Sequence, residues 1–389
     1  MNVMKFGGAV LRDPEGFRRM VQIVREAPTG ETLVVVSAFS TATRDLESAA
    51  QLAQKGLLAE AIGRVDRVVA NHEALAKVLL PVGTSGEGVQ SMLLEARHEL
   101  VTLLNGVSTT RQLTAKTLDR ILVFGEFVAL HIARDVLQEA GLDVTGVDAQ
   151  NIIVTTTEHG NASPLPEKTA LRVEHELLPA FEKHKIVVVQ GFVGRTEDGA
   201  ATTMGKESSN LTATLLGSLL RADEVVIFTD VEGVRSSDPR ICAETVLRPH
   251  LSYDQASIAA HHGLKLLYPT MIEPAALSGI PIRIASAEHP HGESTIIDDN
   301  QDQCGPILII NTDEIDVELT TVFIECAQWL PAATIVVKSL HQRASCDVHT
   351  SHKENTATLR VPKAIGIDVA RRLHTELSHT TQHHETSSR

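Results

Sequence analysis

The stretch from Ile186 to Gly233 decides the fold: it reads IVVVQGFVG (186–194), RTEDGAATTMGKE (195–207), SSNLTATLLGSLLRADE (208–224) and VVIFTDVEG (225–233). An apolar run of strand length is followed by a turn-rich segment, a helical pattern from Ser208 or Ser209, and a second apolar run that ends in Thr229 and Asp230. This pattern predicts a β-loop-α-β unit. Ligands of open α/β sheets bind beyond the carboxyl ends of the strands, and a helix opening with Ser-Ser-Asn offers unpaired N–H groups to an anion. Phosphate is therefore the first ligand class that we consider.

The composition indicates a globular protein. The chain has 389 residues, 43% of them hydrophobic, and a net charge of -14, which argues against nucleic acid or an anionic membrane as the main partner. No apolar run reaches the length of a membrane span, and MNVMKFGG does not resemble a signal peptide. The four cysteines show no metal-ligand or disulfide spacing, so we expect a reducing cytoplasmic location and no metal site: Cys242, Cys304, Cys326 and Cys346.

The order of strand and helix patterns predicts two domains. NVMKF, a helix capped by Asp13 and TLVVVSA form a βαβ start, which implies a mainly parallel sheet in a large α/β domain over residues 1–300. NIIVTT at 151–156 is expected to be a further strand. Residues 305–380 are expected to form a small α+β domain with strands in ILIINTDEIDVELTTV, TIVVKSL and TATLRVP and a helix in AIGIDVARRLHTELSH.

Familiar site motifs are absent, and a set of polar groups at expected strand ends remains. GAATTMGKES misses the Walker spacing, KFGG supplies only two adjacent glycines, and HELLP lacks the second His of a zinc protease. Two or three ammonium groups with hydroxyl and backbone donors suit phosphoryl transfer, which depends on positioning and charge neutralisation. Glu126 stands in an otherwise apolar stretch. It could belong to the site, or it could equally well mark an exposed helix face or a kink at Gly125. The strand-end groups are Lys5, Ser37, Thr43, Glu126, Lys206, Ser209, Thr229, Asp230 and Lys265.

Six motifs in the same order resemble aspartate kinases of the amino acid kinase superfamily. They are KFGG at 5–8, VVVSAFSTAT at 34–43, FGE at 124–126, QGFVG with TTMG at 190–205, FTDVEGV with DPR at 228–240, and GLKLLYP at 263–269. The resemblance covers about residues 1–298. It implies an amino acid kinase fold with a three-layer sandwich around a mainly parallel sheet.

The resemblance also implies a role for each matching residue. Lys5 would contact the transferred phosphoryl group, Lys265 the nucleotide phosphates, and the backbone of Gly7 and Gly8 would donate to phosphate. Glu126 would pair with the ammonium of the substrate, and Lys206 stands where the family has an arginine that grips a substrate carboxylate. The remaining matches are Thr229, Asp230 and Arg240 on the nucleotide and Ser37, Thr43 and Ser209 on aspartate.

Several positions depart from the family pattern. The usual Arg-Gly-Gly-Ser-Asp is here KESSN at 206–210, so Asn210 replaces the acidic residue that orients the catalytic lysine. An amide accepts a hydrogen bond without adding charge, so Lys5 would be held less firmly. Arg235 replaces an aromatic residue near the nucleotide base and could stack or pair with phosphate. Despite these changes we still expect nucleotide binding. The identity of the acceptor substrate is left undecided.

The resemblance implies an ATP-dependent kinase that uses Mg²⁺ and converts L-aspartate to 4-phospho-L-aspartate in amino-acid biosynthesis. One alternative is a kinase of the same superfamily that acts on another small acid. The other is a non-catalytic paralogue that binds nucleotide or amino acid. Aspartate kinases usually end in two ACT domains, whereas the residues after Gly305 suffice for one ACT-like unit, so feedback control stays open. We expect a homodimer, because the small domains of the family commonly pair.

Overall fold

The computed structural model describes residues 1–28, 30–39, 41–80, 84–301, 304–324, 326–339, 347–351 and 355–387. They divide into two compact units, one of residues 1–231 and 285–291 and the other of residues 232–284 and 292–389. The second unit therefore contains the expected small domain together with part of the expected large one. The predicted boundary between residues 300 and 305 stays a prediction.

The first unit is built on five parallel strands in the order β3-β4-β2-β1-β7. A short antiparallel pair, β5 with β6, lies outside this sheet. Nearly every residue of β2 and β4 is buried, as expected for parallel strands that are covered on both faces. The strands are β1 (Asn2–Phe6), β2 (Thr32–Val36), β3 (Val144–Gly146), β4 (Ile186–Gln190), β5 (Val193–Arg195), β6 (Ala201–Thr203) and β7 (Glu224–Thr229).

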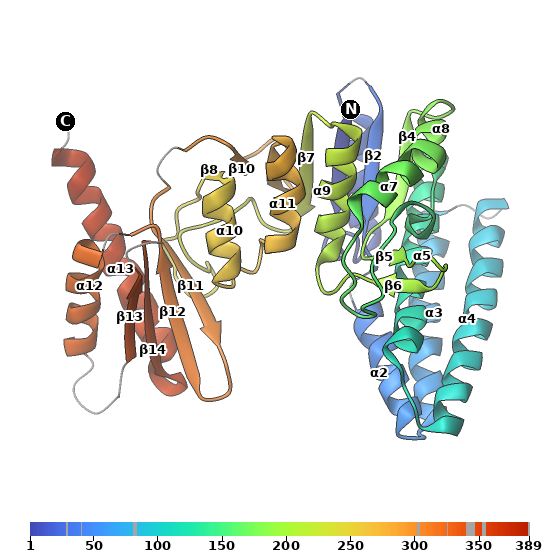
Figure 1. Cartoon of the computed structure of the whole chain (residues 1–389), viewed down its shortest axis with the longest axis horizontal. Coiled ribbons are helices and arrows are strands. Elements are labelled where there is room, and N and C mark those ends of the chain that lie inside the picture. The colour runs from blue at the N-terminus through green and yellow to red at the C-terminus, as the bar shows by residue number, and fades with distance from the viewer. Residues whose placement is uncertain are drawn as a thin grey trace. The chain divides into compact units, whose positions relative to one another are not determined.

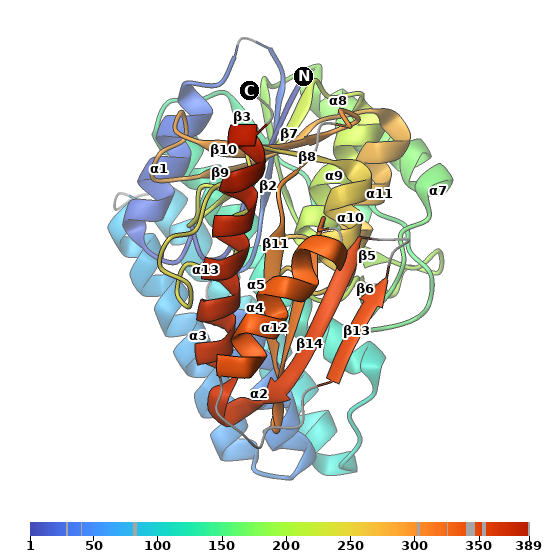
Figure 2. The ribbon, with the colours of Figure 1, turned by 90° about the vertical axis from the view of Figure 1, so that its left-hand side faces the viewer.

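Helices cover both faces of these strands: Figure 2 shows α1 and α9 on opposite sides of β2. Helix α1 starts as the sequence predicts, with the Asp13 side chain accepting from Gly16 N and Pro14 in the first turn. Figure 1 shows α2, α3, α4 and α5 running together, and α5 also packs against β2, β3 and β4. The helices are α1 (Pro14–Arg25), α2 (Ala42–Gln54), α3 (Leu58–Leu79), α4 (Thr84–Thr110), α5 (Ala115–Glu139), α6 (Ala149–Ile152), α7 (Pro166–Arg172), η1 (Val173–Leu177), α8 (Leu178–Phe181) and α9 (Ser208–Leu220).

The second unit combines a short parallel pair with a four-stranded antiparallel sheet in the order β11-β12-β14-β13. Two helices, α12 and α13, lie over one face of that sheet (Figures 1 and 2). The elements are β8 (His250–Ser252), α10 (Tyr253–His261), α11 (Pro269–Ser278), β9 (Ile282–Ser286, whose last two residues belong to the first unit), β10 (Ser294–Asp298), β11 (Ile307–Thr312), β12 (Asp316–Val322), α12 (Cys326–Ser339), β13 (Asp347–Ser351), β14 (Thr356–Pro362) and α13 (Lys363–Ser387).

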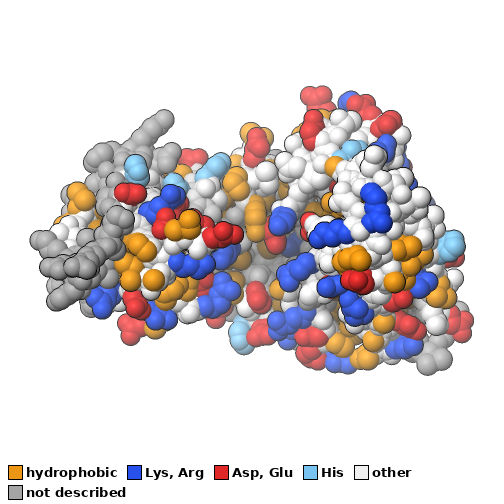
Figure 3. Space-filling view, turned by 90° about the horizontal axis from the view of Figure 1, so that it is seen from below, with side chains coloured by type: hydrophobic (Ala, Val, Ile, Leu, Met, Phe, Trp, Pro, Cys, Tyr) orange, Lys and Arg blue, Asp and Glu red, His pale blue; other side chains and the backbone are white. Residues whose placement is uncertain are grey.

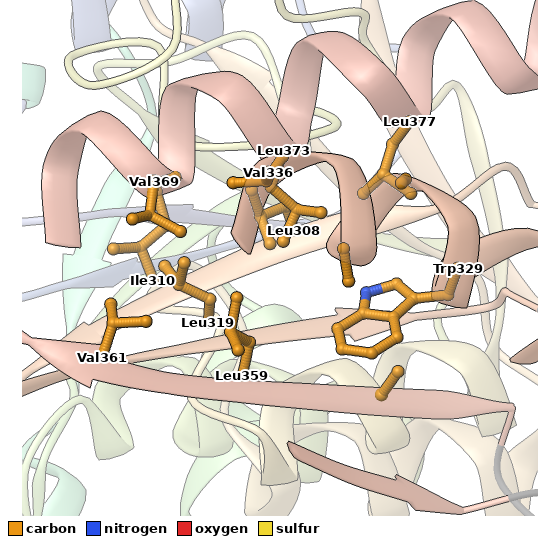
Figure 4. Close-up of a cluster of buried hydrophobic side chains, with 14 of the residues drawn as sticks. Leu308, Ile310, Leu319, Trp329, Val336, Leu359, Val361, Val369, Leu373 and Leu377 are labelled. Carbon is orange, nitrogen blue, oxygen red and sulfur yellow. The ribbon is translucent and has the colours of Figure 1, made fainter. Parts of the chain in front are cut away.

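The core of the small sheet is formed by apolar side chains of its strands and both helices (Figure 4). Trp329 is fully buried, and its indole N–H donates to Thr321 Oγ1 at 3.1 Å. Cys242, from the segment before β8, belongs to the same cluster and is a free thiol, as is Cys304. The side chain of Cys326 and the whole of Cys346 lie outside the described residues. The small sheet thus shares its core with residues that precede residue 300.

Two expected strands are helices. Residues 149–152 form α6, because the Asp148 side chain caps Gln150 N and the Gln190 side chain accepts from Ala149 N, so NIIVTT is strand-like only in the bridges at Val154 and Thr155. TIVVKSL falls in α12 as far as Ser339, and Leu340 lies outside the described residues. Trp329, Ala332, Ala333 and Val336 recur at helical spacing and are all buried. The described order of the small domain is therefore ββαββα, with α12 where the sequence analysis expected a strand.

Acidic and basic side chains are interspersed on the face of the molecule that Figure 3 presents. Among the helices that the structure describes, none combines the length and the hydropathy that a membrane span requires. The mainly parallel α/β fold with a small α+β part is confirmed.

Candidate active site

The predicted site residues of the first unit gather at one edge of the sheet because four parallel strands end in register. Phe6 pairs with Val36 on one side and with Phe228 on the other, and Val36 pairs with Gln190. The next residues along the chain, Gly7, Ser37, Gly191 and Thr229, therefore lie at a common edge. This edge is where a ligand of an open α/β sheet is expected to bind.

Lys5 is the cation of this edge, and it is 5% exposed. A Cβ placed on Gly7 would lie 3.4 Å from Lys5 Nζ, so the ammonium reaches forward past the end of β1. Burial lowers the pKa of Lys5 to about 8, and the carboxylates of Glu207 and Glu126 oppose this shift. Near neutral pH the group is therefore still mostly protonated, and it can neutralise an anion in a place with little water.

Glu126 faces the same edge from α5. It is 4% exposed, and its Oε2 accepts a hydrogen bond of 2.7 Å from Ala38 N in the segment that follows β2. A Cβ on Gly125 would lie 3.2 Å from Ala38 Cβ, so the glycine lets α5 approach that segment closely. Burial raises the pKa of Glu126 to about 8, while the bond from Ala38 N and the charge of Lys5 act in the opposite direction. Because Glu126 is buried, its interpretation as an exposed residue is wrong. The kink expected at Gly125 is also wrong, since α5 continues unbroken through this residue.

The start of α9 completes this edge of the site. Ser209 is 6% exposed and packs so tightly on the end of β4 that a Cβ on Gly191 would lie 2.5 Å from Ser209 Cβ. Asn210 is 5% exposed, and its Oδ1 is buried without a hydrogen-bond partner in the described part of the chain. An unpaired buried acceptor costs about 1–3 kcal/mol, so this amide oxygen is available to a donor from a ligand or from a moved side chain. Lys206, just before the helix, is exposed.

The other predicted residues of the first unit surround these groups. Gly7 N donates to Phe228 O at 3.3 Å, and Gly8 is half-buried in the turn that follows β1. Thr43 is half-buried in the first turn of α2. Asp230 is exposed and accepts from Thr229 Oγ1 at 3.1 Å. A phosphate would have to replace Phe228 O as the acceptor of Gly7 N–H, and the roles of these residues stay predictions.

Three predicted nucleotide contacts belong to the second unit. Arg235 does not stand free for a base or a phosphate: its guanidinium donates to Thr245 Oγ1 and to Thr245 O, at 2.8 and 2.7 Å, and forms an ion pair with Glu232 at 3.1 Å. Arg240 is exposed and forms a two-bond ion pair with Asp238. Lys265 is exposed just after α10. Their part in nucleotide binding stays a prediction.

A family model described as the amino acid kinase family matches residues 1–286. The chain belongs to the amino acid kinase family. Curated relatives of this amino acid kinase include aspartokinase 3 (chloroplastic) of Arabidopsis thaliana, 30% identical over 311 residues, 79% of the chain and 54% of that protein. Lysine-sensitive aspartokinase 3 of Escherichia coli (strain K12) is 28% identical over 295 residues, 76% of the chain and 63% of the relative. The chain thus spans little more than half the length of the plant relative.

Solved structures support the same fold for this amino acid kinase. E. coli aspartokinase III in complex with aspartate and ADP matches 97% of the chain and 83% of that structure, with a TM-score of 0.74 at 23% identity. Aspartate kinase from Clostridium acetobutylicum matches 97% of the chain and 99% of that structure, with a TM-score of 0.71 at 13% identity. At these identities the likeness establishes the fold.

Glu207 is a residue that the sequence analysis did not include among the site residues. It precedes α9 with a φ of 60°, a left-handed conformation that glycine adopts far more easily, and its carboxylate acts on the charges of both Lys5 and Glu126. The sequence offered one signal: a glutamate stands where the family motif has glycine. Its carboxylate therefore adds a negative charge near Lys5 and Glu126 at a backbone position that is costly for a residue with a Cβ.

Proposed function

We propose that this amino acid kinase transfers the γ-phosphoryl group of ATP to the β-carboxylate of L-aspartate. The observation that carries the proposal is the buried pair of Lys5 and Glu126 at the edge where β1 and β2 end. Lys5 supplies a positive charge for a phosphate, and Glu126 supplies a carboxyl group for a substrate ammonium. The names of the relatives and the aspartate and ADP in the neighbouring structure support the same pair of ligands.

The reaction needs charge neutralisation and alignment more than acid–base chemistry. An oxygen of the β-carboxylate attacks the γ-phosphorus in line, the bond to the β,γ-bridging oxygen breaks, and ADP leaves. A carboxylate is ionised at neutral pH, so no general base has to remove a proton. Lys5 and the backbone N–H groups of Gly7 and Gly8 neutralise the charge that develops on the phosphoryl oxygens. Glu126 and Ser209 orient the acceptor.

We propose Mg²⁺ as the metal that accompanies ATP. In the described residues, no group of three or more His, Cys, Asp or Glu side chains is arranged to hold a metal ion. Mg²⁺ in kinases is held by one or two carboxylates together with phosphate oxygens and water, and Asp230 offers such a carboxylate after β7. The residues therefore fit a metal that arrives with the nucleotide, whose charge would offset that of the phosphates.

Lys5→Ala tests the catalytic proposal. Without the ammonium we expect the rate of ADP release with aspartate and ATP to fall by at least about 10³-fold, because the phosphoryl charge loses its buried partner. Lys183→Ala, at an exposed lysine of the same unit, is the control and should keep the wild-type rate. Unchanged turnover in a folded Lys5→Ala protein would remove Lys5 from its assigned role.

A panel of acceptors separates this proposal from its two alternatives. Lys206 in place of an arginine and Asn210 in place of an aspartate would also suit an acceptor other than aspartate. ADP release with another small acid at a higher kcat/KM than with aspartate would identify a different kinase of the family. Nucleotide binding without turnover of any acid would indicate a non-catalytic binding protein.

The small C-terminal part, residues 305–380, is proposed as one ACT-like domain that pairs in a homodimer. Its four-stranded sheet with two helices on one face supports this interpretation. Sedimentation of the full chain tests it, since a monomer at micromolar concentration would exclude the dimer.

A further inference from the structure

Asp119 is a completely buried acid outside the residues assigned above. It lies on α5 with 0% exposure, two helical turns before Glu126 and on the same helix face. Three donors surround its carboxyl group: Thr203 Oγ1 donates to Oδ1 at 2.6 Å, and His159 Nδ1 and Gly160 N donate to Oδ2 at 2.8 and 3.1 Å. A buried carboxyl group with three hydrogen bonds holds its neighbours in fixed places, because each lost bond would leave a buried polar atom unpaired.

The donors come from two segments that are distant in sequence. Thr203 is the last residue of β6, while His159 and Gly160 belong to the loop between α6 and α7. Ala162 N of that loop also donates to Thr203 O at 3.0 Å, which ties the two segments to each other. Asp119 therefore fastens both of them to α5.

The fastened segments lead directly to the start of α9. Gly205 follows β6 with a φ of 86°, and a Cβ placed on it would lie 2.7 Å from Asn161 Oδ1 of the loop. Met204 N, between Thr203 and Gly205, donates to Phe192 O at 3.0 Å, so this turn is held from both sides. The next residues are Lys206 and Glu207, followed by the first turn of α9.

We propose that Asp119 is a positioning residue that sets the segment 205–210 in register with Glu126, and so fixes the distance between the two halves of the acceptor site. Glu126 and Asp119 share one helix, whereas Lys206 and Ser209 follow the turn at Gly205 in the chain. Asp119 thus determines where the groups for the acceptor carboxylate stand relative to the group for its ammonium. This inference rests on the proposed function and assigns a determinant of acceptor affinity within the same site.

The geometry requires the shape of Asp119 more than its charge. An asparagine can keep its Oδ1 as the acceptor for His159 and Gly160 and turn its amide N–H toward Thr203 Oγ1, which can accept. Alanine removes all these bonds. Comparing Asp119→Asn with Asp119→Ala therefore distinguishes positioning from an electrostatic contribution.

The test measures KM for aspartate, Kd for ADP and kcat in Asp119→Ala, Asp119→Asn and Thr203→Val. We expect KM for aspartate to rise at least about tenfold in Asp119→Ala and about threefold or more in Thr203→Val, with Kd for ADP changed less than about twofold. Asp119→Asn should stay within about threefold of wild type. Thr320→Val is the matched control: it removes a partly buried contact between Thr320 and Thr358 in the small sheet and should leave all three constants unchanged.

Amide hydrogen exchange gives a readout that does not depend on turnover. We expect faster exchange in residues 203–211 of Asp119→Ala and Thr203→Val, with β7 unchanged. Equal losses of aspartate and ADP affinity, unchanged exchange at 203–211, or an Asp119→Asn protein as impaired as Asp119→Ala would overturn the proposal. If the wild type failed to phosphorylate aspartate, the proposed function would fall, while the exchange measurement would still decide the role of Asp119. If Asp119→Ala does not fold, Thr203→Val provides the same test.

Discussion

Glu126 Oε2 accepts a hydrogen bond of 2.7 Å from Ala38 N, and this buried bond joins α5 to the segment after β2. It fixes a carboxyl group beside the edge at which β1 ends, one residue after Lys5. Burial nevertheless dominates, so the pKa of Glu126 is raised to about 8 in the unliganded protein. A cation that enters this place would favour the ionised form and would be bound in return, which is the behaviour expected of a site for an ammonium group.

Glu126→Gln should separate the charge of this residue from its structural bond. The glutamine oxygen can still accept from Ala38 N, so the fold should be kept. The ammonium of aspartate would lose its charged partner, and we expect KM for aspartate to rise by about 10–100-fold with little change in KM for ATP. Steady-state kinetics with both substrates check this. A similar rise in KM for ATP would argue that Glu126 does not bind the acceptor.

The same substitution makes a prediction about stability and pH. The folded protein holds a proton on Glu126 up to about pH 8, whereas the unfolded chain releases it near the ordinary value of 4.5. The folded state therefore binds more protons in this window, and the contribution of Glu126 to the free energy of unfolding decreases as pH rises from about 4.5 to 8. Urea unfolding of the wild type and Glu126→Gln at pH 5 and pH 8 measures it. A free energy of unfolding that rises with pH in the wild type relative to Glu126→Gln would contradict the raised pKa.

The lowered pKa of Lys5 predicts how kcat/KM changes at alkaline pH. Its pKa is lowered to about 8, so the free enzyme loses the ammonium above that pH, and kcat/KM should fall there. Lys5→Arg retains a charge at all these pH values, because the guanidinium does not deprotonate. The variant should be slower but should lack the limb near pH 8. A limb that persists in Lys5→Arg would assign the titration to another group.

The location of the site could be predicted from the sequence because strand ends are easy to recognise. Glycines and hydroxyls directly after apolar runs marked Gly7, Ser37 and Thr229, and parallel strands in register bring such positions to one edge. The environment of each charge could not be predicted. The sequence around Glu126 is the same whether this side chain is exposed or buried. Its burial depends on the packing of Ala38 against Gly125, which the sequence does not show.

The sequence reasoning was weakest where tertiary contacts override local preference. TIVVKSL is rich in β-branched residues and was expected to be a strand, yet Val336 on one face of α12 is buried beneath the small sheet. Asp119 gave no signal at all, since its partners Thr203 and His159 come from segments that only the fold brings together. Hydrogen bonds between distant segments do not leave a periodic pattern in the chain.

Asn210→Asp tests the main departure from the family motif. The buried Oδ1 has no partner in the described residues, and a carboxylate at this place would favour the protonated form of Lys5. We expect kcat to rise or to stay unchanged, and the alkaline limb of kcat/KM to move to higher pH. Rate profiles of the variant and the wild type check both. A large loss of activity would show that the amide is adapted to a different geometry.

Gly191→Ala should damage the site through packing alone. An added Cβ would lie 2.5 Å from Ser209 Cβ and 2.6 Å from Ser209 Cα, so the start of α9 has to shift away from β4. We expect a loss of about 1–3 kcal/mol in the free energy of unfolding and a higher KM for aspartate, because Ser209 moves with the helix.

Gly63→Ala, in α3 with nothing within 4 Å of its Cβ, is the matched control. It should be neutral or stabilising by up to about 1 kcal/mol, since alanine favours a helix. Urea unfolding and kinetics measure both variants, and a Gly191→Ala protein that behaves like Gly63→Ala would show that the contact between β4 and α9 does not constrain the site.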